Sequence, residues 1–434
     1  MAEPVTHRRV LAVALPIVLS NVTIPLLGLV DTGVIGQLGR AAPIGAVGIG
    51  AIVLTSVYWI FGFLRMGTTG LAAQARGAGD TNEARALLMR GLLVGGGAGI
   101  IMIVGQAGIF WAAFRLAPAS AEVEALARGY LGIRIWGAPA MISIYAITGW
   151  LIAMERARGV LVLQVVMNGL NIRRDIAFVL GFSWGVEGVA AATLIAEWAG
   201  LALGLWLCRD AFAGGALVAW AQVLDPARLR RMAVVNGDIL VRSVLLQASF
   251  TSFIFIGAGL GDVTLAANQI LAQFLSVTAY ALDGFAFAAE ALVGNAVGQR
   301  RRAVVRRAAV LSSQWGAGFA LALSAGFLLV GPFAIDVMTT APAVQSAARD
   351  YLPWMVAAPV LGVGAFMLDG IFIGATRTHE MRNAMLLSTG IYALALLLLV
   401  PAFGNHGLWA GLMVLYLART ATLARRYPAL EAAV

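Results

Sequence analysis

The chain has 434 residues, of which 61% are hydrophobic and 12% are charged, and its mean hydropathy is +0.88. Soluble domains are usually about 45–50% apolar and about 25% charged, so this composition excludes a soluble fold and makes the bilayer the expected solvent. The formal net charge is +9, and all 30 basic residues are arginines, which excludes a P-loop lysine and a Schiff-base lysine.

Apolar stretches follow one another along the chain. A hydrocarbon core of about 30 Å needs about 20 apolar residues in a helix, and continuous rather than alternating apolarity favours helices over barrel strands. We expect about twelve transmembrane helices, near residues 10–35, 44–69, 88–114, 129–154, 160–181, 186–208, 233–258, 265–296, 308–331, 351–374, 384–401 and 407–424. The first stretch exceeds the roughly 7–15 residues of a signal-peptide core, so we expect it to remain as a span.

Arginines gather in alternate loops between these spans. The opposite loops hold only Arg40, Arg115, Arg128 and Arg349. The positive-inside rule therefore predicts a multi-pass protein with both termini in the cytoplasm. The expected location is the bacterial cytoplasmic (inner) membrane. Because topology accounts for the basic charge, we expect no nucleic-acid partner. Trp111 and Trp409 are predicted to lie at membrane interfaces.

The chain repeats itself at about half its length. "YLGIRIWGAPA" begins at Tyr130 and "YLPWMVAAPV" begins at Tyr351. Gly149 in "TGWLIAMERAR" likewise matches Gly370 in "DGIFIGATRTH", and both pairs differ by 221 residues. A duplicated membrane chain with charged groups inside its spans is typical of a transporter, because paired halves can rock about a central site.

The repeat predicts the domain organisation. We expect an N-terminal six-helix lobe over residues 1–208, a cytoplasmic linker loop over 209–231 and a C-terminal six-helix lobe over 232–434. Since six is an even number, both lobes enter the membrane from the same side, which is the parallel type of repeat.

Three segments resemble the multidrug and toxic compound extrusion (MATE) family, in particular its DinF-like branch. They are "ALDGFAFAAEALVGNAVGQ" from Ala281, "GDVTLAANQIL" from Gly261 and "VLQVVMNGLNIRRDIAFVLG" from Val162. The resemblance implies an all-α membrane protein of twelve helices in two pseudo-symmetric lobes, arranged as a V around a central cavity. It also implies a monomer without a cofactor that exports amphipathic drugs or organic cations in exchange for H⁺ or Na⁺.

A first-lobe cation or proton site is suggested by polar residues inside two spans. Asn171 and Asp175 are four residues apart and share a helix face with Asn168. Their oxygens suit Na⁺ or a hydrogen-bonded proton, and we expect no other metal site. The resemblance implies that Asp31, Asn171, Asp175 and Thr193 form this site. Two nearby buried carboxylates repel each other, which favours proton uptake by one of them.

Arg173 and Arg174 depart from the family pattern, which has apolar residues there. Charges at mid-span are costly, so they need partners. Arg174 could neutralise Asp175 or reach Asp31, or both arginines could have been introduced to disrupt or probe the site.

A possible second-lobe site comprises Asp283, Glu290 and Asp369. Asp283 and Glu290 are seven residues apart on one helix face, where lining the cavity and satisfying local backbone are equal alternatives. Asp238 and Arg242 are one helical turn apart, and this spacing predicts an ion pair between them.

Other side chains are candidates for contact with substrate or for movement. Met141, Tyr145, Met154 and Phe287 could form a pliable drug surface, with ordinary helix packing as the alternative. Pro16 interrupts the hydrogen bonds of the first span and is the candidate conformational hinge, with a static kink as the alternative.

The main interpretation is a cation-coupled multidrug efflux antiporter. The alternative is a flippase of lipid or lipid-linked precursors, which the intramembrane residues Arg65, Arg134, Arg173, Arg174 and Arg242 keep open because such cargo is anionic. We do not expect an enzyme, since the sequence shows no paired metal ligands, no "GxSxG" and no "HExxH".

Overall fold

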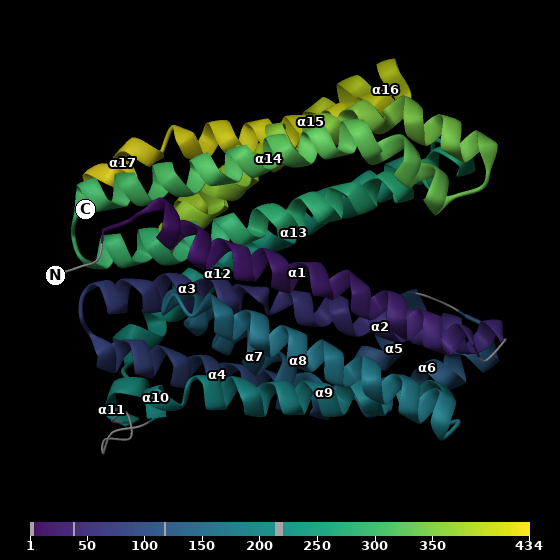
Figure 1. The fold of residues 1–434 in the computed structure, drawn as a ribbon, viewed down its shortest axis with the longest axis horizontal. Helices are drawn as coiled ribbons and strands as arrows, with labels where there is room; N and C mark the ends of the chain where they lie inside the picture. The colour runs from purple at the N-terminus through teal and green to yellow at the C-terminus, as the bar shows by residue number, and fades with distance from the viewer. Residues whose placement is uncertain (1–3, 38–39, 117–118, 213–219) are drawn as a thin grey trace. The chain divides into compact units, whose positions relative to one another are not determined.

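The structure, a computed structural model, describes residues 4–37, 40–116, 119–212 and 220–434. Within the helices His7–Gly36 and Gln106–Leu116 it leaves the side chains of residues 24–29, 31, 32 and 116 undescribed. The described residues form helices and no strands, as Figure 1 shows, which confirms the predicted all-α class.

Nine α-helices form the described part of the first half of the chain. They are α1 (His7–Gly36), α2 (Ala41–Ile60), α3 (Gly62–Gly77), α4 (Thr81–Val104), α5 (Gln106–Leu116), α6 (Ala121–Arg134), α7 (Ala138–Ala153), α8 (Ala157–Asp175) and α9 (Gly185–Leu207). The short 3₁₀ helix η1 (Ile135–Gly137) joins α6 to α7, and the π-helix η2 (Ile176–Gly181) follows α8.

Eight α-helices form the described part of the second half: two short ones, then five long ones and a short last one. They are α10 (Arg209–Phe212), α11 (Trp220–Val223), α12 (Pro226–Ala258), α13 (Asp262–Gly298), α14 (Arg302–Met338), α15 (Pro342–Gly374), α16 (Thr378–Ala424) and α17 (Tyr427–Ala432). α16 comprises two helices that meet at Gly404, whose φ of 55° and ψ of −127° are not helical. Glycine reaches such angles without a steric penalty.

The predicted spans correspond to these helices. Within the described residues, nine helical segments are long and apolar enough to cross a membrane. Counting also α1, α8 and the second helix of α16 accounts for the twelve predicted spans. α8 is not among the nine segments because the arginines in its last turn lower its apolarity. The predicted span over 160–181 extends beyond α8 into the apolar residues that follow it.

The contacts divide the chain into two compact units. The C-terminal unit holds Met1–Val18, Arg76–Ala78 and Ala233–Val434, and the N-terminal unit holds Leu19–Ala75 and Gly79–Met232. The division falls within α1, so the first turns of this helix pack with the helices of the second half. In the N-terminal unit α4 packs on α7, α8 on α9, and α6 on both α2 and α9. In the C-terminal unit α13, α14 and α15 pack on one another along their lengths (Figure 1).

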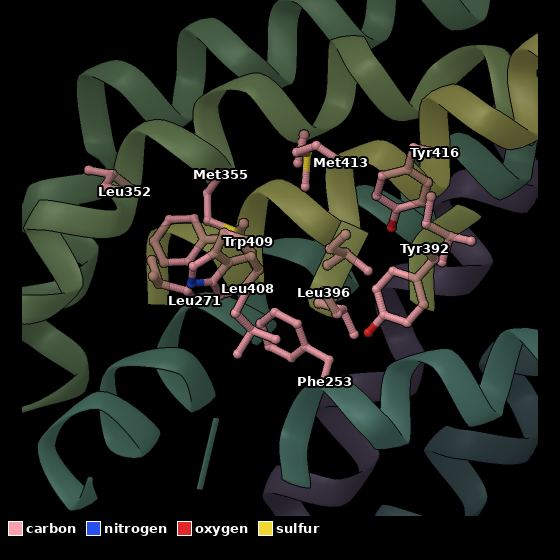
Figure 2. Packing of buried hydrophobic residues seen from close by; sticks show 14 of the residues in the cluster. Phe253, Leu271, Leu352, Met355, Tyr392, Leu396, Leu408, Trp409, Met413 and Tyr416 are labelled. Carbon is pink, nitrogen blue, oxygen red and sulfur yellow. The ribbon is translucent and has the colours of Figure 1, made fainter. Parts of the chain in front are cut away.

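The core of the C-terminal unit centres on Trp409, which is fully buried. Its ring meets that of Phe253 edge-on, with centroids 4.5 Å apart. Figure 2 labels both side chains in this cluster. Its indole N–H donates a 2.9 Å hydrogen bond to Oδ1 of Asn268, which also exchanges hydrogen bonds with Asn405. A buried Trp needs such a partner for its N–H. Trp409 is therefore not exposed as an interface anchor, which the prediction requires, while Trp111 is exposed.

Candidate ion-coupling and substrate sites

A buried polar contact joins α8 to α9. The side-chain amide of Asn171 donates a 3.0 Å hydrogen bond to Oγ1 of Thr193, whose hydroxyl donates to the carbonyl of Val189 at 2.9 Å. Asn171 and Asp175 are 1% and 0% exposed. Oδ1 of Asn171 is buried and has no hydrogen-bond partner among the described residues. Three of the four residues expected to form the first-lobe site thus lie on two paired helices, and one amide oxygen remains able to accept a ligand.

The same face of α8 is attached to α1. Nδ2 of Asn168 donates to Oγ1 and to the carbonyl of Thr23, at 2.9 and 3.2 Å, and Gln164 donates to Oδ1 of Asn168 at 3.2 Å. Asp31, the fourth residue of the expected site, lies further along α1, and its side chain is outside the described residues. The helix that carries it is nevertheless fixed to α8 through Thr23.

The backbone changes from α-helix to π-helix directly after Asp175. η2 covers the next six residues, and Asp175 is its N-cap. π-helical segments are rare, and they occur frequently at functional sites. Arg173 is exposed, while Arg174 is partly buried and its Nη1 has no hydrogen bond to any described residue. Pairing of Arg174 with Asp175 stays a hypothesis.

Asp369 lies in a buried ion cluster of the C-terminal unit. Its Oδ2 accepts hydrogen bonds from Nη2 of Arg242, on α12, and from Nη2 of Arg419, on α16. All three side chains are less than a tenth exposed. Asp283, on α13, is within Coulombic range of Arg242. Asp369 is thus occupied by guanidinium groups in this arrangement and is not open to a cation.

Asp238 has different partners from the one its spacing predicts. Its Oδ1 accepts a 2.7 Å hydrogen bond from Nη1 of Arg382, and its Oδ2 accepts one of 3.1 Å from Thr378. The predicted Asp238–Arg242 pair is therefore wrong, because Arg242 turns to Asp369 on another helix.

The remaining predicted residues occupy two helices. Asp283 is partly buried, Glu290 is 1% exposed, and Phe287 lies between them in the α13 sequence and is partly buried. On α7, Met141 and Tyr145 are partly buried.

Met154 lies at the end of a helix, whereas Pro16 lies inside one. Met154, also partly buried, is the C-cap of α7. Pro16 lies in α1, which continues through it as one helix. A role for either residue in transport stays a prediction.

A cavity of about 490 Å³ opens between α13 and α14. Its wall is apolar apart from Gln273, and Phe274 and Phe327 stand edge to face in it with centroids 5.1 Å apart. Small-molecule sites typically have volumes of about 300–1,000 Å³ and mostly apolar walls. Met141, Tyr145, Met154 and Phe287 do not belong to this wall, and their contact with substrate stays a prediction.

A second buried ion pair, in the N-terminal unit, was not assigned as a site from the sequence. Nη1 of Arg134, on α6, lies 2.7 Å from Oε1 of Glu197, on α9, and the two side chains are 10% and 6% exposed. Opposite charges inside two apolar spans were the available signal, because such charges need a partner in the membrane.

These features define a class before any comparison: an integral membrane protein of two repeated helical halves with ionisable groups buried among its spans, which is the organisation of a secondary transporter. The family model described as MatE matches residues 16–176 and 239–399. The chain belongs to the MATE family, whose members are transporters.

Curated relatives agree with this assignment. The chain is 40% identical over 425 residues to DNA damage-inducible protein F of Escherichia coli (strain K12), covering 95% of this chain and 90% of that protein. It is 27% identical over 340 residues to a probable multidrug resistance protein NorM of Synechocystis, covering 74% and 70% of the two chains.

Solved structures confirm the fold. A crystal structure of MATE in the bent conformation superposes with a TM-score of 0.89 at 19% identity, covering 98% of this chain and 96% of that one. An outward-facing multidrug resistance MATE transporter gives a TM-score of 0.85 at 18% identity, with 98% and 97% covered. The fold class of two repeated six-helix halves is therefore confirmed.

Proposed function

We propose that the protein is a cation-coupled multidrug efflux antiporter that exports amphipathic organic cations by alternating access, in exchange for H⁺ or Na⁺. The NorM relatives, described as probable multidrug resistance proteins, support the export of drugs. The proposed location is the bacterial cytoplasmic membrane, with both termini in the cytoplasm, and the proposed working form is a monomer.

The observation that carries the coupling is the buried polar face of α8. Asp175 is fully buried, and Asn171 offers an amide oxygen without a hydrogen-bond partner among the described residues. The Asp175 carboxylate and the Asn171 amide oxygen are hard donors that suit a proton or Na⁺. The amide group of Asn171 is held in place by its hydrogen bond to Thr193. A charge at such depth is costly, which favours a functional reason for it.

The arginines favour a cationic over an anionic cargo. Arg134 is neutralised by Glu197, and Arg242 and Arg419 share Asp369 within Coulombic range of Asp283. These guanidinium groups are already matched by carboxylates inside the protein. An anionic lipid headgroup would have to break such pairs, so the flippase alternative receives less support than drug export.

The apolar cavity between α13 and α14 supports an amphipathic cargo. Its volume of about 490 Å³ accommodates the ring system of a small drug, and Phe274 and Phe327 offer aromatic faces. A cationic group is attracted to the face of an aromatic ring. Burial of the apolar part of the drug offsets the cost of removing water from its charge.

The test uses purified protein in liposomes that contain a fluorescent cationic dye. Wild-type protein should move the dye when a proton or sodium gradient is imposed, and collapse of that gradient should stop it. Asp175→Asn should abolish movement, whereas Glu187→Gln, which changes an exposed acid of α9, should not. Dye movement that ignores both gradients, or transbilayer movement of a labelled lipid without movement of dye, would contradict the proposal.

A further inference from the structure

The junction of α2, α6 and α9 contains a buried polar cluster that the proposed α8–α9 cation site does not use. Glu197 and Arg134 form its 2.7 Å ion pair, and Tyr58, on α2, is 4% exposed and within Coulombic range of both. Tyr145 and Tyr130 also act electrostatically on this pair.

The groups that face Glu197 come from every side of the cluster. They are Arg134 on α6, Tyr58 on α2 and Tyr145 on α7, with Tyr130 of α6 within Coulombic range of Arg134 and Arg65 of α3 within Coulombic range of Tyr145. The paired helix α8 presents the uncharged Asn171, which bonds Thr193 one turn before Glu197 on α9. Arg134 is thus the basic group in direct contact with the Glu197 carboxylate.

Several polar atoms in this cluster lack a hydrogen bond within the described part of the chain. They are Oε2 of Glu197, Nε of Arg134 and the hydroxyl of Tyr58. Buried polar atoms are nearly always hydrogen-bonded, so these atoms, which come from three helices, can take up a further proton or hydrogen-bond partner. Oε2 of Glu197 can accept a proton, and the Tyr58 hydroxyl can then bond the neutral carboxyl or the guanidinium.

A glycine of the η1 backbone leaves room for the Glu197 carboxylate. A Cβ on Gly137, in η1, would lie only 1.8 Å from Oε2 of Glu197, so any other residue would displace the carboxylate. The indole N–H of Trp198, next to Glu197, donates to the carbonyl of Trp136 at 3.1 Å. The ion pair and this hydrogen bond together hold α9 against η1, the joint between α6 and α7.

The second half of the chain shows that helix packing does not need these charges. With the offset of Tyr130 and Tyr351, Arg134 corresponds to Met355. Gly185 and Gly404 both have positive φ and begin the equivalent final helices, which places Tyr416 opposite Glu197. Met355 and Tyr416 are buried and uncharged at neutral pH. The ion pair is therefore specific to the first half.

We propose that Glu197 is a proton-binding site of the N-terminal unit, in which a proton from water adds to Oε2 and releases Arg134 from its ion pair. The released guanidinium no longer holds α6 to α9, so the η1 joint loosens. The proposal rests on the proposed cation-coupled export and adds a carboxylate outside the α8–α9 site. A proton suits the site better than Na⁺ because Arg134 already places a positive charge on the carboxylate.

The test measures proton binding on the full-length protein in nanodiscs, without drug. Infrared difference spectra between neutral and acidic pH should show carboxyl protonation in wild type, and Glu197→Gln should remove one component of that band. Because this variant leaves Arg134 unpaired, the double variant Arg134→Met with Glu197→Gln removes both charges and should lose the same component. Glu187→Gln, on the exposed side of α9, is the matched control and should retain it.

Hydrogen exchange of residues 131–139 tests the release of Arg134. After correction for the intrinsic exchange rate at each pH, these amides should exchange several-fold faster at acidic than at neutral pH in wild type, whereas the double variant should show no such change. An unchanged carboxyl band in the double variant, or the same pH dependence of exchange in both proteins, would overturn the proposal. Neither readout requires transport, so a wild type that fails to move dye would contradict the proposed function without altering these results.

Discussion

Gly149, on α7, packs against the backbone of Arg65, on α3, so closely that a Cβ would lie 2.4 Å from the Arg65 carbonyl oxygen. Gly370, on α15, makes the same 2.4 Å approach to the carbonyl of Ala286, on α13. Residues 286 and 65 differ by 221, as do residues 370 and 149. The same helix–helix contact therefore occurs once within each half. Small residues permit such close contacts between helices in membranes.

Alanine at either glycine should destabilise the protein. Because backbone atoms line the contact, Gly149→Ala and Gly370→Ala should each cost about 1–3 kcal/mol through overpacking. Gly97→Ala on α4, which has no atom within 4 Å, is the control and should be neutral or slightly stabilising. The measurement is the fraction of monodisperse protein after heating in detergent. Equal loss in all three variants would show that the close approach is unimportant.

The buried cluster at Asp369 predicts a large effect from a small change. Asp369→Asn leaves Arg242 and Arg419 without their carboxylate, and breaking a buried pair in this way typically costs about 3–5 kcal/mol. Asp336→Asn removes a half-exposed pair with Arg349 and should cost about 1 kcal/mol or less. Thermal stability in the same detergent compares the two variants. Similar losses in both would mean that the cluster is solvated.

Arg90 should hold the linker that follows α9. Its Nε and Nη2 donate to the carbonyls of Val223 and Gln222 at 2.8 and 2.6 Å, and its Nη1 bonds Glu83 at 2.7 Å. Arg90→Met should therefore release α11 from α4 and increase trypsin cleavage within 209–231 several-fold. Arg85→Met, on the same helix, serves as the control. An unchanged cleavage rate at the linker would contradict this role.

A surface ion pair makes α10 sensitive to acid. Arg156 donates to both carboxylate oxygens of Asp210, at 2.7 and 2.6 Å, and these hydrogen bonds hold the pKa of Asp210 below its ordinary value of 3.8. The folded pKa is lowered, so the stabilisation is complete above the ordinary value and is lost as the pH falls through the lower folded pKa. The effect is small because both side chains are about half exposed.

Hydrogen exchange of residues 208–212 at several pH values measures this effect. Protection in wild type, relative to Asp210→Asn at the same pH, should disappear below about pH 3.8. A difference between the two proteins that does not depend on pH would rule out this explanation.

The fold could be predicted from the sequence because the bilayer fixes the length of an apolar helix. The duplication was also visible, through Tyr130 and Tyr351, and the MatE matches to residues 16–176 and 239–399 confirm it. Trp409 shows the limit: its aromatic character predicted a membrane interface, but its hydrogen bond to Asn268 allows full burial.

The partners of buried charges could not be predicted from spacing. Asp238 and Arg242 are one turn apart, yet each bonds a residue more than 100 positions away in sequence. Local spacing gives only which side chains share a helix face, whereas the packing of α12 against other helices determines which charges meet. For the same reason Arg134 was noticed as an intramembrane charge, but its pairing with Glu197 was not predicted.

The π-helix η2 has a consequence for how this chain can change. A π-turn contains one residue more than an α-turn, so Ile176–Gly181 hold a surplus residue relative to a regular helix. Deleting one residue there would restore ordinary winding and rotate everything beyond it, including Trp184, whose ring lies tilted against that of Phe178 with centroids 4.8 Å apart. Deletion of one residue after Asp175 would thus change which side chains of the following segment face each neighbouring helix. The rest of the span would keep its length.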